Sequence, residues 1–164
     1  MGAVEDGATL ALVEASTRMK LKRDWRLIDL LPLFPELGEV PARGSFALRE
    51  PAEGQGRYVK DTGGRRQAAG VRLRGSPLSE LLISLPHEDQ TRENTDTFRR
   101  ERALLLGVVE AIARSTNPAW RCHMQAAIER DENASSMAIQ VAAAMAVEDL
   151  CRKGLWTPQP PEVA

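Results

Sequence analysis

The segment MAIQVAAAMAV, residues 137–147, contains a single polar side chain, that of Gln140. Alanine and methionine favour the α-helix, and the segment is far shorter than the roughly 20 residues of a membrane-spanning helix. A helix that is apolar on nearly every side has to be surrounded by other elements or by a partner. The segment therefore predicts a helix that is covered by the rest of the fold or by a second copy of the chain.

Two further helices are predicted beside this segment. Residues 96–114 have apolar side chains at helical spacing, namely Phe98, Leu105, Val108, Val109 and Ile112. Asn117-Pro118 is a start signal for a second helix, with an inner stripe of Trp120, Met124, Ala127 and Ile128. The third helix covers about 134–153, and Gly154 is suited to end it. Short connections favour antiparallel packing, so the sequence predicts an antiparallel three-helix bundle over residues 96–154.

The part of the chain before the bundle is predicted to mix helix and strand. Residues 8–31 show an amphipathic helical pattern that is interrupted by prolines from Pro32 onward. Residues 77–85 are expected to form a short helix, because Ser76 is a good N-cap and Pro77 suits the first helical position.

The region 44–75 is the one place where strands are expected. Short alternating segments are separated by the turn-forming stretches 53–56 and 61–64. These features favour a small, basic antiparallel β-meander, and an irregular loop is the alternative. The predicted fold class is thus α+β and mainly α, with one domain over residues 1–156 and a mobile Pro-rich tail over 157–164.

Charge is unevenly distributed along the chain, although the net charge is only −1. Residues 1–76 hold 13 Lys or Arg and 10 Asp or Glu, a net charge of +3, whereas residues 77–164 have a net charge of −4. This asymmetry indicates an oriented contact with a partner, or head-to-tail self-association.

A basic cluster is the first candidate binding surface. It consists of Arg57, Lys60, Arg65, Arg66, Arg72 and Arg74, to which Lys20, Lys22 and Arg23 could add. Phosphate backbones are the commonest target of such a cluster. Tyr58 is the one aromatic residue nearby, which is a poor supply of stacking surfaces for single strands. Two other interpretations remain open, namely a solvated basic face that protects a sheet edge and a contact with an acidic protein.

Two apolar sets are candidate protein-contact surfaces. The first lies on the predicted 134–153 helix and consists of Met137, Val141 and Met145. Methionine adapts well to partner surfaces. The second follows the pattern Leu-x-x-Leu-Leu and consists of Leu27, Leu30 and Leu31. A helix of this kind can dock into a groove of a partner, and ordinary core packing is the alternative.

Catalytic and metal-binding patterns are weak. Asp61-Thr62-Gly63 resembles the active-site triplet of aspartic proteases, but a turn explains it fully. Cys122 and His123 are adjacent in sequence, so on a helix they point in different directions and cannot easily share one ion. His123 is interpreted as a boundary residue with a hydrogen bond, and Cys122 and Cys151 as buried reduced thiols. No cofactor and no metal are therefore expected.

These observations favour a non-enzymatic interaction or assembly protein that acts through a helical surface, as a subunit of a larger complex or as a homo-oligomer. The alternative is a nucleic-acid-binding accessory protein that uses the Arg-rich residues 57–74. The expected partner is a protein or a second copy of the chain, with nucleic acid as the alternative and no membrane. The N-terminus lacks a secretory signal, so a cytoplasmic location is expected.

Overall fold

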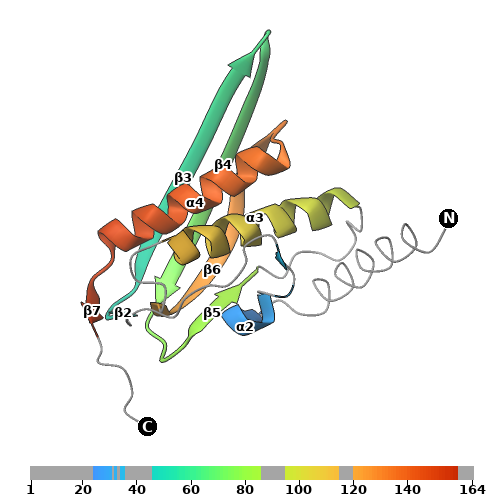
Figure 1. The fold of residues 1–164 in the computed structure, drawn as a ribbon. Coiled ribbons are helices and arrows are strands. Elements are labelled where there is room, and N and C mark those ends of the chain that lie inside the picture. Colours follow the sequence, from blue (N-terminus) through green and yellow to red (C-terminus); the bar gives the residue numbers. More distant parts are fainter. Residues whose placement is uncertain are drawn as a thin grey trace, which may run out of the picture.

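The computed structural model describes residues 24–30, 32, 34–35, 46–85, 95–114 and 120–158. In these residues a seven-stranded mixed sheet packs against two long helices, which lie side by side on one face of the sheet (Figure 1). The elements in chain order are β1 (Asp24–Arg26), α2 (Leu27–Leu30), β2 (Phe46–Leu48), β3 (Ala52–Thr62), β4 (Arg65–Ser76), β5 (Leu81–Ser84), α3 (Thr95–Arg114), β6 (Trp120–Glu132), α4 (Ser136–Lys153) and β7 (Trp156–Pro158). The prediction of a mainly α fold with a C-terminal three-helix bundle is therefore wrong.

Strand β6 is the central element of the sheet. It pairs with β4 in antiparallel and with β5 and β2 in parallel orientation. Beyond these neighbours, β1 pairs with β5, β7 with β2, and β3 with β4, each in antiparallel orientation. The helix predicted after Asn117-Pro118 is wrong, because residues 120–132 form this strand.

The alternation of side chains along β6 explains that error. Trp120, Cys122, Met124 and Ala126 are buried under the helices, whereas Gln125 is exposed. This period of two is the strand period. Positions 120, 124 and 128 satisfy both the strand and the helix period, so the predicted helical stripe was compatible with either structure. The burial of Cys122 and Ala126 fits the strand alone.

The short helix predicted over 77–85 is also wrong, since β5 occupies residues 81–84. β5 lies between β1 and β6 and is hydrogen-bonded on both edges. Its run of apolar residues is typical of a strand that is covered on both faces. Pairing with two neighbours has therefore prevailed over the local capping signals of Ser76 and Pro77.

The region predicted as a small meander contains the two longest paired strands in the first half of the chain. β3 and β4 pair continuously from Ala52↔Gly75 to Thr62↔Arg65. Gly63 and Gly64 form the turn with φ values of 57° and 81°, a conformation that glycine adopts without steric cost. The turn predicted at 61–64 is confirmed. The turn predicted at 53–56 is wrong, because these residues continue β3.

Helices α3 and α4 confirm the first and third predicted helices. Ser135 caps α4 by accepting a hydrogen bond from the N–H of Ala138 at 3.2 Å. One side of α4 packs on β3 and β4 and another on α3, which buries most of its alanines: Ala138, Ala142, Ala143 and Ala146. Small side chains allow this close approach on two sides, so the apolar segment 137–147 is largely covered within the chain.

Several predictions concern residues outside the described part of the structure. Residues 8–23 of the helical segment predicted over 8–31 lie there, and so does most of the tail 157–164. Within that segment, Asp24–Arg26 form strand β1, so the helical prediction is wrong at these residues, whereas Leu27–Leu30 form helix α2. Thr157 and Pro158 belong to β7, which contradicts a mobile tail at those two positions. In the part of the chain that the structure describes, no helix is long and apolar enough to span a membrane.

Candidate nucleic-acid interface

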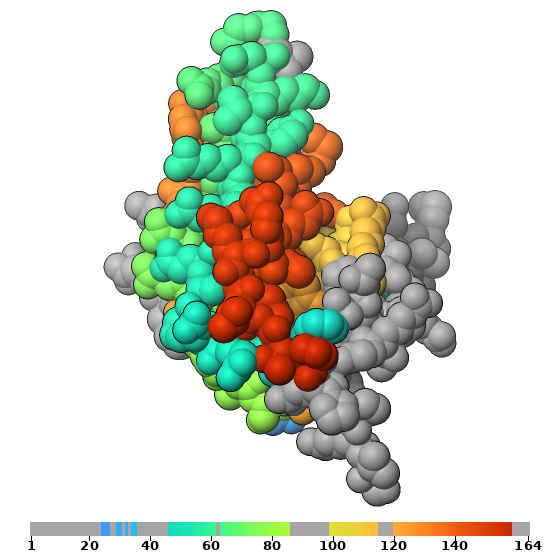
Figure 2. Space-filling view, turned by 90° about the vertical axis from the view of Figure 1, so that its left-hand side faces the viewer, coloured from blue at the N-terminus to red at the C-terminus, as the bar shows by residue number. Residues whose placement is uncertain are grey.

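The tip of the β3–β4 hairpin projects beyond the other elements of the fold (Figure 1). We call residues 57–67 the arm. β6 accompanies β4 only as far as the pair Ala68↔Glu132, so the last part of the arm has two strands and, among the described residues, no third. Figure 2 shows it extending from one end of the molecule, past α4. Beyond Val59 the arm is thus a two-stranded ribbon that is accessible from both faces.

The cations of the arm divide between its two faces. Side chains alternate along each strand, and residues that are paired across the strands lie on the same face. Arg57 therefore lies on the same face as Arg66, which pairs with Asp61. Lys60 and Arg65 lie on the opposite face, which is continuous with the helix-covered side of the sheet. The arm contains four cations and one anion, a net charge of +3.

These four cations have no ion-pair partner among the described residues, unlike the two arginines nearer the centre of the sheet. Arg72 pairs with Glu129 at 2.6 Å, and Arg74 pairs with Glu53 at 3.3 Å. The predicted cluster is therefore brought together on one hairpin, but its two halves differ. The positive charge is neutralised near the sheet and remains available on the arm. Lys20, Lys22 and Arg23 lie outside the described residues.

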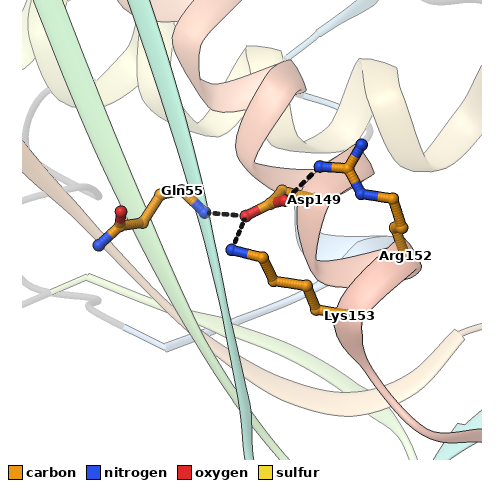
Figure 3. A network of polar contacts seen from close by, with 4 residues as sticks. All are labelled: Gln55, Asp149, Arg152 and Lys153. Atoms are coloured by element: carbon orange, nitrogen blue, oxygen red, sulfur yellow. Dashed lines mark hydrogen bonds and ion pairs between the residues drawn. The ribbon is translucent and has the colours of Figure 1, made fainter.

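An ionic network holds the base of the hairpin (Figure 3). The Asp149 carboxylate on α4 accepts a hydrogen bond from the backbone N–H of Gln55 at 2.9 Å. It also contacts Lys153 at 2.9 Å and Arg152 at 2.6 Å. Hydrogen bonds from Lys153 and from the Gln55 N–H lower the pKa of Asp149 to about 2. The sequence showed the spacing of Asp149, Arg152 and Lys153 on one helix but gave no sign of the contact with Gln55.

Strand β3 is an edge strand, because β4 is its one partner among the described residues. The N–H of Gln55 faces the free edge, since it bonds to Asp149 and not to β4. Asp149 thus fills an edge position that would otherwise be open to another strand.

The residues predicted to contact a partner protein differ in their exposure. Met137 and Met145 on α4 are 52% and 41% exposed, and Val141 between them is half-buried. These three residues form one stripe on the outer face of α4, the element in the foreground of Figure 2. Leu30 is buried in the core, which agrees with ordinary core packing, the alternative given for the Leu-x-x-Leu-Leu segment. The side chain of Leu27 and the whole of Leu31 lie outside the described residues.

One polar cluster was not foreseen from the sequence. Ser84 Oγ on β5 lies 2.5 Å from Asp24 Oδ1 on β1 and 2.6 Å from His123 Nε2 on β6. Ser84 donates its single proton to Asp24, so toward His123 it accepts from the Nε2–H. A serine protease triad has the histidine in the middle instead. Ser84 is also only 6% exposed. This cluster therefore joins three strands and lacks the arrangement of a nucleophilic site.

The remaining predicted side chains have ordinary roles. The hydrogen bond predicted for His123 is confirmed, although the residue lies on a strand and not on a helix. Cys122 is buried, and burial raises the pKa of its thiol to about 12. Cys151 is exposed, so the prediction that it is buried is wrong. Among the residues that the structure covers, no group of three or more His, Cys, Asp or Glu is placed to hold a metal ion.

Comparison with known proteins adds little to this geometry. No protein-family model matches the chain, and no curated protein matches it. Among solved structures, the chain is similar to the crystal structure of a protein from Thermus thermophilus, with a TM-score of 0.49 and 23% sequence identity. That similarity covers 72% of this chain and 18% of the Thermus protein.

Proposed function

We propose that the protein binds nucleic acid as an accessory factor and that the arm is its binding element. The observation that carries this proposal is the position of Arg57, Lys60, Arg65 and Arg66. All four are exposed on the arm, and none has an ion-pair partner among the described residues. Cations that are not neutralised by the protein itself are free to replace the counterions of a phosphate backbone.

The type of cation supports phosphate as the target. Three of the four are arginines, whose guanidinium group matches phosphate oxygens with two parallel hydrogen bonds. The whole chain has a net charge of −1, so the attraction is confined to the arm and does not result from a generally basic protein. An anionic partner is therefore oriented toward the arm as it approaches.

The test compares two double variants that remove the same charge. Arg65→Ala with Arg66→Ala removes two cations of the arm, and Arg99→Ala with Arg114→Ala removes two exposed cations of α3. Binding to fluorescein-labelled DNA is measured by fluorescence anisotropy at several salt concentrations. We expect the arm variant to bind more weakly to every sequence. The slope of log K against log salt, which is negative, should become smaller in magnitude by about 2. Equal binding by the two variants would refute the proposal.

A second candidate function is self-association through α4, as a subunit of an assembly. It is supported by the exposure of Met137 and Met145 on one stripe with Val141. A two-fold contact brings the same stripe of two copies together, and methionine side chains adapt to such a surface. Light scattering after size-exclusion chromatography tests it. Met137→Lys with Met145→Lys should convert a dimer into a monomer, whereas Leu78→Lys, on another exposed apolar residue, should not.

A further inference from the structure

We infer that the arm enters the major groove of duplex DNA and contacts the phosphates of both groove walls. This inference rests on the proposed function and specifies its substrate class. It follows from three features of the arm, namely the distribution of its cations, its dimensions and its shortage of stacking side chains. Each of these distinguishes a groove from a single strand or a flat anionic surface.

The distribution of charge is the first feature. Arg57 and Arg66 are on one face of the ribbon, and Lys60 and Arg65 are on the other. A ribbon that lies flat on a strand or surface uses the cations of one face and leaves the other two in solvent. A ribbon between two rows of phosphates uses all four. The walls of a duplex groove provide such rows, one from each strand.

The dimensions of the arm are the second feature. From Arg57 to the turn at Gly63 the arm advances six residues, or about 20 Å at the rise of a β-strand, and the last four of these, about 14 Å, lie beyond the end of the pairing with β6. The major groove of B-form DNA is about 12 Å wide and 8.5 Å deep, and it admits a two-stranded β-ribbon. The deep major groove of A-form RNA is too narrow for side chains to read. The arm therefore has the reach and the width for DNA in its B form.

The shortage of stacking surfaces is the third feature. Proteins that bind single strands without sequence preference stack the bases on aromatic side chains. Tyr58 is the one aromatic residue of the arm, and it packs against the hydrophobic core. Tyr58 therefore takes part in the packing of the protein itself and is not available to stack on a base. Contacts with phosphates remain, and these suit a duplex whose bases are already stacked.

The attachment of the arm adds to this argument. Its base is paired with β6 through β4, covered by α4 and held by the bond from Gln55 to Asp149. An element that is fixed in this way loses little conformational entropy when it binds. The arm is thus already oriented to enter a groove.

The experiment removes the cations of each face separately. One variant carries Arg57→Ala and Arg66→Ala, and the other carries Lys60→Ala and Arg65→Ala. The probes are a mixed-sequence DNA duplex of about two helical turns, one of its strands alone, and the RNA duplex of the same sequence. Four phosphate contacts give a salt slope of about −3.6 on the DNA duplex, and loss of either face reduces it by about 1.8.

The outcomes separate this inference from the proposed function. Binding to the DNA duplex in preference to the other probes, with similar losses for the two variants, supports groove insertion. If one face accounts for the whole loss, or if the single strand or RNA duplex binds as well, groove insertion is wrong and nucleic-acid binding stands. If none of the probes binds, both are wrong. Circular dichroism and an Arg57→Lys, Arg66→Lys variant, which should retain binding, exclude an effect of misfolding.

Discussion

The carbonyl oxygen of Ala142 lies well inside van der Waals distance of the position that a Cβ atom on Gly56 would occupy. Gly54 has the same relationship to the carbonyl oxygen of Ala146. These two glycines are on the face of β3 that α4 covers, one strand repeat apart. The absence of side chains there allows the helix backbone to rest directly on the strand.

Replacing Gly56 with alanine should therefore destabilise the protein by about 3 kcal/mol or more, because the contact is with backbone atoms that cannot rotate away. Urea unfolding followed by circular dichroism measures the difference. Gly63→Asn is the matched control. Gly63 has a positive φ that asparagine tolerates, and no atom lies near its Cβ position. Comparable losses in both variants would contradict the packing described for α4.

Replacing Asp149 with asparagine should reduce the free energy of unfolding by about 2 kcal/mol at neutral pH. The folded-state pKa of about 2 lies below the ordinary value of 3.8. The carboxylate therefore contributes fully above about pH 4, and its contribution is lost as the pH falls through about 2. Urea midpoints of the two proteins should differ at neutral pH and converge in acid. A difference that does not depend on pH would argue against this assignment.

Replacing Ser84 with alanine should cost about 1 to 2 kcal/mol, because the substitution leaves the His123 N–H and the Asp24 carboxylate facing a methyl group. The loss is measured against Ser79→Ala, which changes an exposed serine near the start of β5. If Ser84→Ala is no more destabilising than Ser79→Ala, the three side chains do not form the connected cluster.

The two cysteines should differ sharply in reactivity. Ellman's reagent is expected to modify Cys151 in the folded protein, since this residue is exposed. Cys122 should react only after unfolding, because it is buried and its pKa is raised to about 12. A Cys151→Ser variant should have no rapidly reacting thiol. Two rapidly reacting thiols in the native protein would place Cys122 on the surface and contradict the orientation of β6.

The sequence predicted correctly those elements whose stability is local. The helices α3 and α4 have long periodic patterns, and Gly154 marks the end of α4. The turn at Gly63-Gly64 was equally clear, because two successive glycines suit a conformation with positive φ. The cations of the arm were found for the same reason, since they lie close together along the chain.

The elements that were mispredicted depend on partners distant in the sequence. β5 is a strand because β1 and β6 pair with its two edges, and no pattern within residues 77–85 reveals those neighbours. The sequence pattern predicted a turn at Gly54 and Gly56, whereas both glycines lie on strand β3 in direct contact with α4. The spacing of the two glycines by two residues, opposite a helix with alanines at 142 and 146, was the available signal. The hydrogen bond from Gln55 to Asp149 joins residues that are 94 positions apart, and no signal in the sequence indicated it.

The free edge of β3 has a consequence for the solubility of the protein. Asp149 occupies this edge at Gln55, but farther along the arm the N–H groups of Arg57, Val59 and Asp61 face the same way. An open edge of this kind is a template on which a second molecule can add a strand, which is how aggregation begins. Cations on both faces of the arm make two such edges repel each other. Neutral variants of the arm should therefore precipitate more readily than lysine-for-arginine variants, which keep the repulsion.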